Sequence, residues 1–351
     1  MASQNRQLRR VLCIYNTDYD EELKAETGAD VSAVQEAARA VCQGIADFGF
    51  ETELLGVEGP DIDRVIAKLK DDPPDLVFNL CESMSGDVRN EVVLPSLLDM
   101  LKIPYTGPGP LTILMCLHKD RTKDVLHQAK ISTPDHRVLS APADLEDPGL
   151  ADLDYPYFLK LAHEDASIGI EAANVVADRD ALVARATAML DKFKQPLICE
   201  QFIEGREVNV TVMDTEDGLT TLPLHEISFA DMPDDRPKIV SYAAKWDENH
   251  VDYEGTKPVP MKGVSPELEK AIVDISVDTF RALDLHDFGR VDLRIDSAGV
   301  PWVIDVNPNC DLSPDAGVAR AARYAGLTFP ELVGRVCQSA WRRKQRAAAA
   351  S

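Results

Sequence analysis

Apolar runs and amphipathic stretches alternate over the first third of the chain. Three runs predict strands: "VLCIY" (11–15), "ETELLGV" (51–57) and "DLVFNL" (75–80). Amphipathic stretches with the spacing of surface helices follow them near 31–48, 61–70 and 91–101. Because strands that alternate with helices are typical of a parallel sheet covered by helices, we expect an α/β fold here.

A different pattern begins at Tyr155. Four stretches have the composition of strands: "YPYFLKLA" (155–162), "PLICEQFI" (196–203), "EVNVTVMD" (207–214) and "LTTLPLHEISF" (219–229). Helices are predicted near 179–193, 265–283 and 315–325. This part of the chain is therefore expected to be α+β, with a second domain that begins near 120–130.

Two segments near the C-terminus, 288–296 and 300–307, predict an antiparallel hairpin around the turn "SAG". Side chains alternate along a strand, so Arg290 and Asp292 share one face of the first segment. Val303, Asp305 and Asn307 are expected to share one face of the second. If the loop centres between Ala298 and Gly299, Asp292 lies across from Asp305, and Arg290 across from Asn307.

The predicted pairing places two carboxylates directly opposite each other, which destabilises a sheet. A divalent cation removes this repulsion. Oxygen ligands from Asp292, Asp305 and Asn307, without histidine or cysteine, suit Mg²⁺ or Mn²⁺. A solvated acidic face without a metal is the alternative interpretation.

Composition narrows the classes of partner. The 351 residues include 60 acidic and 37 basic side chains, with a formal net charge of −23, which argues against nucleic acid or an anionic membrane as the partner. No apolar stretch approaches the ~20 residues of a membrane span. Seven scattered cysteines without a CxxC pair indicate buried thiols in a reducing cytoplasm. The length predicts two or three domains.

Candidate phosphate-binding residues are lysines, because the sequence has neither a GxxxxGK[ST] loop nor a GxGxxG motif. Lys160 ends an apolar strand and precedes a loop that contains Ser167 and Gly169, where a lysine can bind phosphates. An ordinary lysine at a strand end is the alternative. In "CEQFIEGREVNVTV", Glu200 and Glu207 flank a short connector that can bind a purine and a ribose, unless it is a plain acidic turn.

These motifs together resemble the ATP-grasp enzymes, most closely the D-alanine–D-alanine ligase group. The segments that carry the resemblance are Lys160, "ASIGI", "EQFIEGREVNV", "AKW", "GRVDLRID" and "IDVNPN". The resemblance implies an ATP-grasp fold in which ATP lies between two antiparallel sheets. It also implies an N-terminal α/β domain (1–118), a central lid (119–205) and a C-terminal catalytic domain (206–340), before a tail (341–351).

The resemblance implies a role for each matching residue. Lys119 and Lys160 would contact the nucleotide phosphates, Ser167 would lie in the loop over them, and Lys245 would reach the terminal phosphate. Glu200, Gln201 and Ile203 would contact adenine, and Glu207 the ribose. Asp292, Asp305 and Asn307 would bind two Mg²⁺ ions, and Arg290 would stabilise the transferred group.

The resemblance fails in the part that would bind amino acids. Gly28 stands where the family has an acid that binds the first amine, and residues near 16–28 form an apparent insertion. Ala166 replaces a serine of the phosphate lid, Trp246 a tyrosine, and Ala316 a serine near the C-terminus. Cys81 and Glu82 stand where the family has His-Gly. For the substrates, the candidate contacts are Glu82, Glu91 and Ser313.

The resulting hypothesis is an ATP- and Mg²⁺-dependent ligase that joins a small carboxylate to an amine, with amino acids as the expected substrates. The alternatives are an authentic D-alanine–D-alanine ligase, a non-catalytic ATP-binding regulatory protein, and a phosphoryl transferase that releases its phosphorylated product. The resemblance also suggests a homodimer, and we expect a cytoplasmic location.

Overall fold

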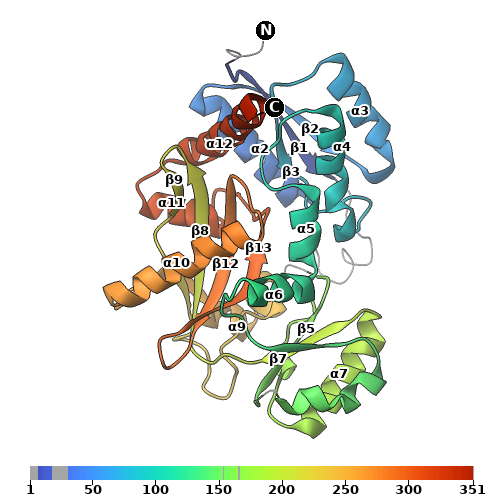
Figure 1. Ribbon diagram of the computed structural model, residues 1–351, viewed down its shortest axis with the longest axis vertical. Coiled ribbons are helices and arrows are strands. Elements are labelled where there is room, and N and C mark those ends of the chain that lie inside the picture. Colours follow the sequence, from blue (N-terminus) through green and yellow to red (C-terminus); the bar gives the residue numbers. More distant parts are fainter. Residues whose placement is uncertain (1–6, 18–30, 153, 165–166, 351) are drawn as a thin grey trace.

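The N-terminal part is a three-stranded parallel sheet with helices on its faces (Figure 1). The computed structural model describes residues 7–17, 31–152, 154–164 and 167–350. The strands are β1 (Arg10–Asn16), β2 (Glu51–Val57) and β3 (Leu76–Leu80), in the order β2-β1-β3. The helices are α2 (Val31–Phe48), α3 (Ile62–Asp71) and α4 (Val93–Leu101). The parallel sheet predicted from the alternating pattern is confirmed.

The central part is an antiparallel sheet covered by one long helix. Its strands, in the order β4-β7-β5-β6, are β4 (His136–Leu139), β7 (Leu197–Gln201), β5 (Tyr157–Leu161) and β6 (Val175–Val176). Helix α7 (Arg179–Phe193) starts at Asp178, whose carboxylate accepts a hydrogen bond from Ala181 N. Leu182 and Met189 of α7 pack on Leu159 of the sheet.

The C-terminal part is a second antiparallel sheet, in the order β11-β10-β8-β12-β13, with β9 paired to β8. Its strands are β8 (Arg206–Thr215), β9 (Gly218–Thr221), β10 (His225–Ser228), β11 (Lys257–Pro260), β12 (Phe288–Ile295) and β13 (Pro301–Asn307). Helix α10 (Pro266–Ala282) covers one face, where Ile272 and Phe280 pack on Val291. The opposite face is left to polar residues of the site described below.

The predicted hairpin register is correct at the acidic pair. Asp292 pairs with Asp305, and Arg290 with Asn307. Nearer the turn, however, the register shifts by one residue because a β-bulge falls between Asp292 and Leu293. Val303 therefore packs in the core beside Leu293, and Ile304 faces the cleft. The prediction that Val303 shares a face with Asp305 is wrong, because the bulge adds one residue to β13.

Further helices among the described residues connect and cover these sheets. They are α5 (Pro110–Leu117), α6 (Lys119–Gln128), α8 (Tyr242–Trp246), α9 (Val251–Gly255), α11 (Gly317–Tyr324) and α12 (Phe329–Ala350). Leu126 of α6 packs in the core of the C-terminal sheet. Leu126 belongs to the predicted central domain, so its packing against the C-terminal sheet crosses the predicted boundary. The domain ranges 1–118, 119–205 and 206–340 therefore stay a proposal.

The predicted tail is part of helix α12 (Figure 1). Trp341 is buried in a core that also contains Val11 and Val41. Arg343 donates hydrogen bonds to Tyr105 O at 2.7 Å and Gly107 O at 3.0 Å. The range 341–351, predicted as a tail, thus continues α12 as far as residue 350, with tertiary contacts at Trp341 and Arg343 and with residues 345–349 exposed.

Some of the predicted differences from the family motif cannot be placed in the structure. Gly28, Ala166 and residues 18–28 of the apparent insertion lie outside the described residues. Within the described ranges, no helix is long and apolar enough to span a bilayer.

Candidate ATP and metal site

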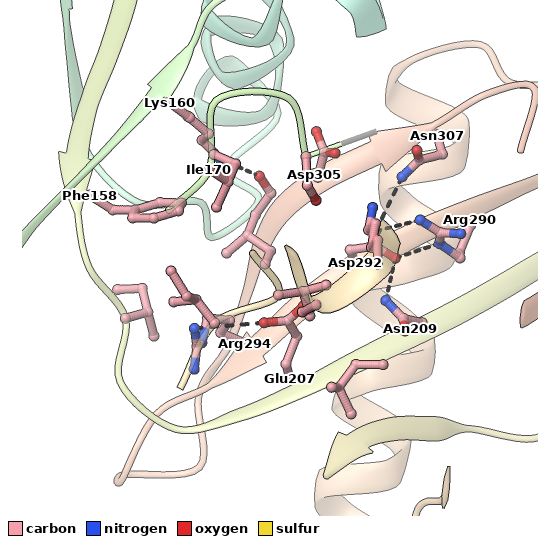
Figure 2. A pocket seen from close by; sticks show the side chains of 18 of the residues that line it. Phe158, Lys160, Ile170, Glu207, Asn209, Arg290, Asp292, Arg294, Asp305 and Asn307 are labelled. Atoms are coloured by element: carbon pink, nitrogen blue, oxygen red, sulfur yellow. Dashed lines mark hydrogen bonds and ion pairs between the residues drawn. The ribbon is translucent and has the colours of Figure 1, made fainter. Parts of the chain in front are cut away.

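A cleft of about 340 Å³ lies between the central and C-terminal antiparallel sheets (Figure 2). Its volume falls in the range of small-molecule sites. Lys160 and Glu200 line it from the central sheet, and Glu207, Asp292 and Asp305 line it from the C-terminal sheet. The sequence prediction that a ligand site lies between two antiparallel sheets therefore corresponds to an actual cavity.

Asp292 is the most extensively hydrogen-bonded carboxylate of the cleft (Figure 2). Arg290 binds both of its oxygens, with Nε to Oδ1 at 2.8 Å and Nη2 to Oδ2 at 2.9 Å. The side-chain amides of Asn209 and Asn307 donate to it at 2.7 Å and 3.2 Å. Burial opposes the charge of Arg290, but Asp292 outweighs that effect and raises the pKa of the guanidinium. Arg290 is thus a fixed, permanently charged group.

Asp305 lies opposite Asp292 and faces the lysines. Lys119 Nζ is 3.3 Å from Asp305 Oδ1. Burial of Asp305 disfavours its charge, but Lys119 and Lys160 together outweigh burial, so the pKa of the carboxyl lies below its ordinary value. The side chain keeps 30% of its surface exposed to the cleft. An ionised, accessible carboxylate is what a cation ligand requires.

Lys160 and Glu200 belong to a buried charge cluster with Lys123. Glu200 is 2.8 Å from Lys160 Nζ and 2.7 Å from Lys123 Nζ. Burial raises the pKa of Glu200, but the two lysines lower it further than burial raises it, so the carboxylate is ionised. Burial lowers the pKa of Lys123 to about 8 despite the pull of Glu200. Lys160 also donates to Ile304 O at 3.0 Å.

Lys123 was missed in the sequence. It follows Lys119 by four residues on α6, so both side chains lie on one face of the helix. That spacing in "KDRTKD" was the available signal. The structure adds a specific partner, because Lys123 Nζ also donates to Thr133 Oγ1 at 2.9 Å.

The predicted nucleotide residues lie on the connector between β7 and β8 and at the strand ends that flank it. Gln201, Ile203 and Glu207 all line the cleft, together with the ring of Phe158. Burial raises the pKa of Glu207, and Arg294, whose Nη1 is 3.7 Å away, opposes this shift. Arg294 was not predicted as a site residue.

Arg294 holds the connector in place. It donates to Gly205 O at 3.0 Å and to Lys238 O at 2.8 Å. Its guanidinium carbon lies 4.9 Å from the centre of the Phe202 ring. This arginine therefore fixes the backbone between Glu200 and Glu207.

Two more predicted residues reach the cleft from loops and short helices. Ser167 lines it with a left-handed backbone, φ +62°. Lys245 lines it from the last turn of α8 and is solvent-exposed. Ser241 caps this helix by accepting a hydrogen bond from Ala244 N.

The three predicted substrate residues lie elsewhere among the described residues. None of Glu82, Glu91 and Ser313 lines the cleft. Glu91 accepts a hydrogen bond from Asn309 Nδ2 at 3.1 Å, and Ser313 Oγ donates to Asp311 Oδ1 at 2.5 Å. Glu82 N donates to Asn16 Oδ1 at 3.1 Å. Substrate contact by these three side chains stays a prediction.

His225 was also missed. It lines the cleft from β10 and is only 2% exposed. Its Nδ1 has no hydrogen-bond partner among the described residues. Burial lowers its pKa to about 4, with a further contribution from Arg290, so the imidazole is neutral near pH 7.

The donor set of the cleft fits a hard divalent cation. Asp292 and Asp305 provide carboxylate oxygens and Asn307 an amide group on adjacent strands, with cations of the chain on both sides. Oxygen ligands of this kind suit Mg²⁺, which keeps positions for phosphate oxygens. Lys119, Lys160 and Arg290 provide positive charge for an anionic ligand in a chain whose total charge is −23.

Comparisons with known proteins give a consistent result. A family model described as "D-ala D-ala ligase C-terminus" matches residues 126–338. D-alanine–D-alanine ligase of Marinobacter nauticus is 31% identical over 284 residues, which cover 79% of each chain. Uncharacterized protein y4sG of Sinorhizobium fredii is 29% identical over 315 residues, covering 89% of this chain and 86% of that protein.

A solved structure also matches nearly the whole chain. D-alanine–D-alanine ligase from Bacillus anthracis, complexed with ATP, has a TM-score of 0.75 at 20% identity and covers 97% of this chain and 100% of that chain. The ATP-grasp fold predicted from the motifs is confirmed.

Proposed function

The chain belongs to the D-alanine–D-alanine ligase family, and we propose that it is an ATP-dependent carboxylate–amine ligase. The observation that carries the proposal is the paired face of β12 and β13, by which we mean the side of these two paired strands that lines the cleft. It sets Asp292, Asp305 and Asn307 beside Arg290, and across the cleft from Lys160. This arrangement suits transfer of a phosphoryl group to another anion.

The proposed reaction has two steps. A carboxylate oxygen of the first substrate attacks the γ-phosphorus of ATP. The bond between this phosphorus and the oxygen that bridges it to the β-phosphate breaks, which gives an acyl phosphate and releases ADP. The amine nitrogen of the second substrate then attacks the acyl carbon. The bond to the phosphate oxygen breaks, the nitrogen loses a proton, and phosphate and an amide are released.

The chain's own cations stabilise the negative charge of both steps. Arg290 is held by both oxygens of Asp292, so its position is fixed before substrates bind. Lys119, Lys160 and Lys245 line the same cleft. Preorganised charges of this kind reduce the reorganisation needed in the transition state.

We propose that the nucleotide lies along the connector between β7 and β8. Ile203 and Phe158 provide apolar surface for the base, and Glu207 lies where the next strand begins and can accept from ribose hydroxyls. Glu200 would orient Lys160 and Lys123 towards the phosphates.

For the metal, we propose two Mg²⁺ ions, with Mn²⁺ as a substitute. Asp292, Asp305 and Asn307 would hold them. When bound, the ions neutralise phosphate charge and align the transferred group. Asn209 and Arg290 would keep Asp292 in place, since both already bind it.

Authentic D-alanine–D-alanine ligase activity is the second candidate, favoured by the named relative from Marinobacter nauticus. Substitution of the residues expected to bind the amino acids, such as Ala316, favours another acid and amine. We therefore propose amino-acid substrates that differ from two D-alanines.

The test measures Mg²⁺-dependent ADP and phosphate release with single and paired D- and L-amino acids, followed by mass spectrometry of the products. One active pair with a new amide establishes the ligase, and D-alanine alone establishes the second candidate. ATP binding with no turnover for any acceptor would contradict both and favour a regulatory protein. Release of a phosphorylated acid without an amide would favour phosphoryl transfer.

We propose further that the protein acts as a homodimer in the cytoplasm, where ATP is available. Light scattering after size-exclusion chromatography tests the dimer. A single peak at the 38.6 kDa of one chain would contradict it.

A further inference from the structure

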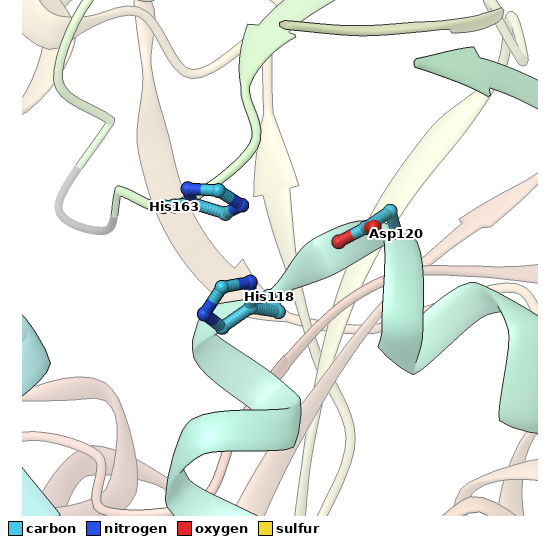
Figure 3. Close-up of side chains that lie close together, drawn as sticks. All are labelled: His118, Asp120 and His163. Atoms are coloured by element: carbon cyan, nitrogen blue, oxygen red, sulfur yellow. The ribbon is translucent and has the colours of Figure 1, made fainter. Parts of the chain in front are cut away.

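A second group of potential metal ligands lies at the start of α6. His118 precedes the helix, Asp120 lies in its first turn, and His163 follows β5 by two residues (Figure 3). One ligand atom from each of these residues lies within 4.8 Å of the other two. The group shares no residue with the paired face of β12 and β13.

The backbone brings these side chains together. Lys119 N donates a hydrogen bond to Ala162 O at 3.1 Å, which fixes the start of α6 beside the end of β5. The two imidazole rings consequently lie with their centroids 4.1 Å apart. Figure 3 shows Asp120 and the two rings surrounding one common space.

The carboxylate of Asp120 is only partly satisfied. Its Oδ1 is buried and has no hydrogen-bond partner within the described part of the chain. Its Oδ2 lies 3.4 Å from Arg121 Nε, and the side chain is 14% exposed. A buried carboxylate oxygen without a partner costs free energy, which a bound cation would recover.

His163 is suited to bind a metal at neutral pH. Burial lowers the pKa of His163, and the neighbouring His118 lowers it further, which favours the neutral ligand form. Arg89 and Lys119 add positive charge near His163. An ion here would therefore be held by direct coordination and not by a negative field.

We propose that His118, Asp120 and His163 bind one transition-metal ion, with Zn²⁺ as the expected occupant. Two imidazole nitrogens and one carboxylate oxygen suit Zn²⁺, whereas Mg²⁺ prefers oxygen ligands alone. Tetrahedral Zn²⁺ has ligands at ~2.0–2.2 Å, so the side chains must turn inward by about an ångström. A water molecule completes the four ligands.

The site would link two parts of the ATP cleft. Lys119, which follows His118, pairs with Asp305, and the β5–β6 connection that contains His163 also contains Ser167. A bound ion would therefore join α6 to the loop that borders the cleft. We expect it to stabilise this junction in the absence of ATP.

The test titrates Zn²⁺ into chelator-treated, full-length protein by calorimetry, without ATP and with excess Mg²⁺ to occupy oxygen-ligand sites. We expect one equivalent to bind, and Co²⁺ in its place to give the visible absorption of a tetrahedral site. His118→Ala and His163→Ala should each weaken binding by at least ~10-fold. Zn²⁺ should raise the unfolding temperature of the wild type but of neither variant.

Two further variants make the result specific. His127→Ala removes another histidine of α6, outside the group, and should bind Zn²⁺ as the wild type does. Asp305→Ala should also retain Zn²⁺ binding. If this variant does not bind Zn²⁺, the ion lies at the pair of Asp292 and Asp305, and the proposal is overturned. Absence of saturable binding by the wild type, or unchanged affinity in both histidine variants, would likewise overturn it. His163→Asn replaces His163→Ala if circular dichroism shows that the latter is unfolded.

Discussion

The side chain of Asp305 forms an ion pair with Lys119 and is also a proposed ligand of the metal. Asp305→Ala removes a ligand and leaves Lys119 without the carboxylate at 3.3 Å. We expect ATP turnover to fall by more than ~100-fold with the fold intact, because loss of a direct ligand exceeds the effect of losing a supporting partner. Coupled measurement of ADP release, with a Mg²⁺ titration, checks this.

Asp296 is a matched control on the same hairpin. It accepts hydrogen bonds from Ala298 N, Val300 N and Trp302 Nε1, each at 2.9 Å, and does not line the cleft. Asp296→Ala should lower the free energy of unfolding by about 1–2 kcal/mol and leave turnover per folded molecule unchanged. Near-normal turnover of Asp305→Ala, or equal loss in both variants, would reject the role of Asp305.

His225 gives a prediction about pH. Its pKa in the folded protein is about 4, below the unfolded value near 6.5, so the unfolded state binds more protons between these pH values. Its contribution to stability is thus complete above pH 6.5 and declines as the pH falls towards 4. We expect His225→Leu to reduce the loss of unfolding free energy between pH 7 and 5 by about 2 kcal/mol. Urea unfolding at both pH values measures this. If the unfolding free energy of the variant falls between pH 7 and 5 by as much as that of the wild type, the prediction is contradicted.

At this scale the sequence was most informative where several motifs coincided. Arg290, Asp292, Asp305 and Asn307 come together as the alternation of a hairpin predicts. His225 could not be assigned from its neighbours in sequence, since it reaches the cleft only through tertiary contacts, and the spacing that puts Lys123 on one helix face with Lys119 does not reveal its ion pair with Glu200. A lysine or histidine on an amphipathic element has the same local pattern whether it faces solvent or a cavity.

At the scale of elements, the turn between β7 and β8 depends on Gly205. Its φ is +145°, and a Cβ there would lie 1.9 Å from Ile295 O, which is backbone and cannot move aside cheaply. Gly205→Ala should therefore cost about 2–4 kcal/mol and weaken ATP binding, because the turn positions Glu200 and Glu207. Urea unfolding and calorimetric ATP titration measure the two effects.

Gly218 provides the control for strain alone. Its φ is +108°, and a Cβ there would meet nothing within 4 Å. Gly218→Ala should cost about 1–2 kcal/mol and leave ATP affinity unchanged. Equal effects of both substitutions would show that the contact with Ile295 O does not matter.

The β-bulge in the hairpin is a feature that the alternation of side chains did not predict. Alternation placed Val303 and Asp305 on one face, yet one extra residue sends Val303 to the core and Ile304 to the cleft. The pairing of the two acids was still correct, because the turn and the bulge shift the register in opposite directions. A bulge of this kind leaves no composition signal, since both Val303 and Ile304 are apolar.

At the scale of the whole molecule, the alternating pattern predicted the parallel sheet and the resemblance implied the two antiparallel sheets, but neither predicted the contacts between the parts. The single strand predicted over 219–229 is wrong, because the structure has two strands there, β9 and β10, which both pair with β8. Leu126 of α6 packs with the C-terminal sheet, and Trp341 of α12 packs with Val11 of the N-terminal sheet. Such contacts join residues that are distant in sequence, so no local period reports them. The alanine-rich sequence near the end therefore did not reveal that Trp341 is buried against the N-terminal sheet.

Arg343 joins three parts of the molecule and gives the last prediction. It donates to Asp287 Oδ2 at 2.9 Å and to the carbonyls of Tyr105 and Gly107, while Asp287 is fully buried. Arg343→Ala leaves this carboxylate without its cation, so we expect a loss of about 3 kcal/mol in unfolding free energy. Arg342→Ala removes an ion pair to Glu216, which is 81% exposed and 3.9 Å away, and a hydrogen bond to Asp214 O at 3.2 Å, so it should cost only about 1 kcal/mol. Equal unfolding midpoints in urea for the two variants would show that the C-terminal helix is not held by this arginine.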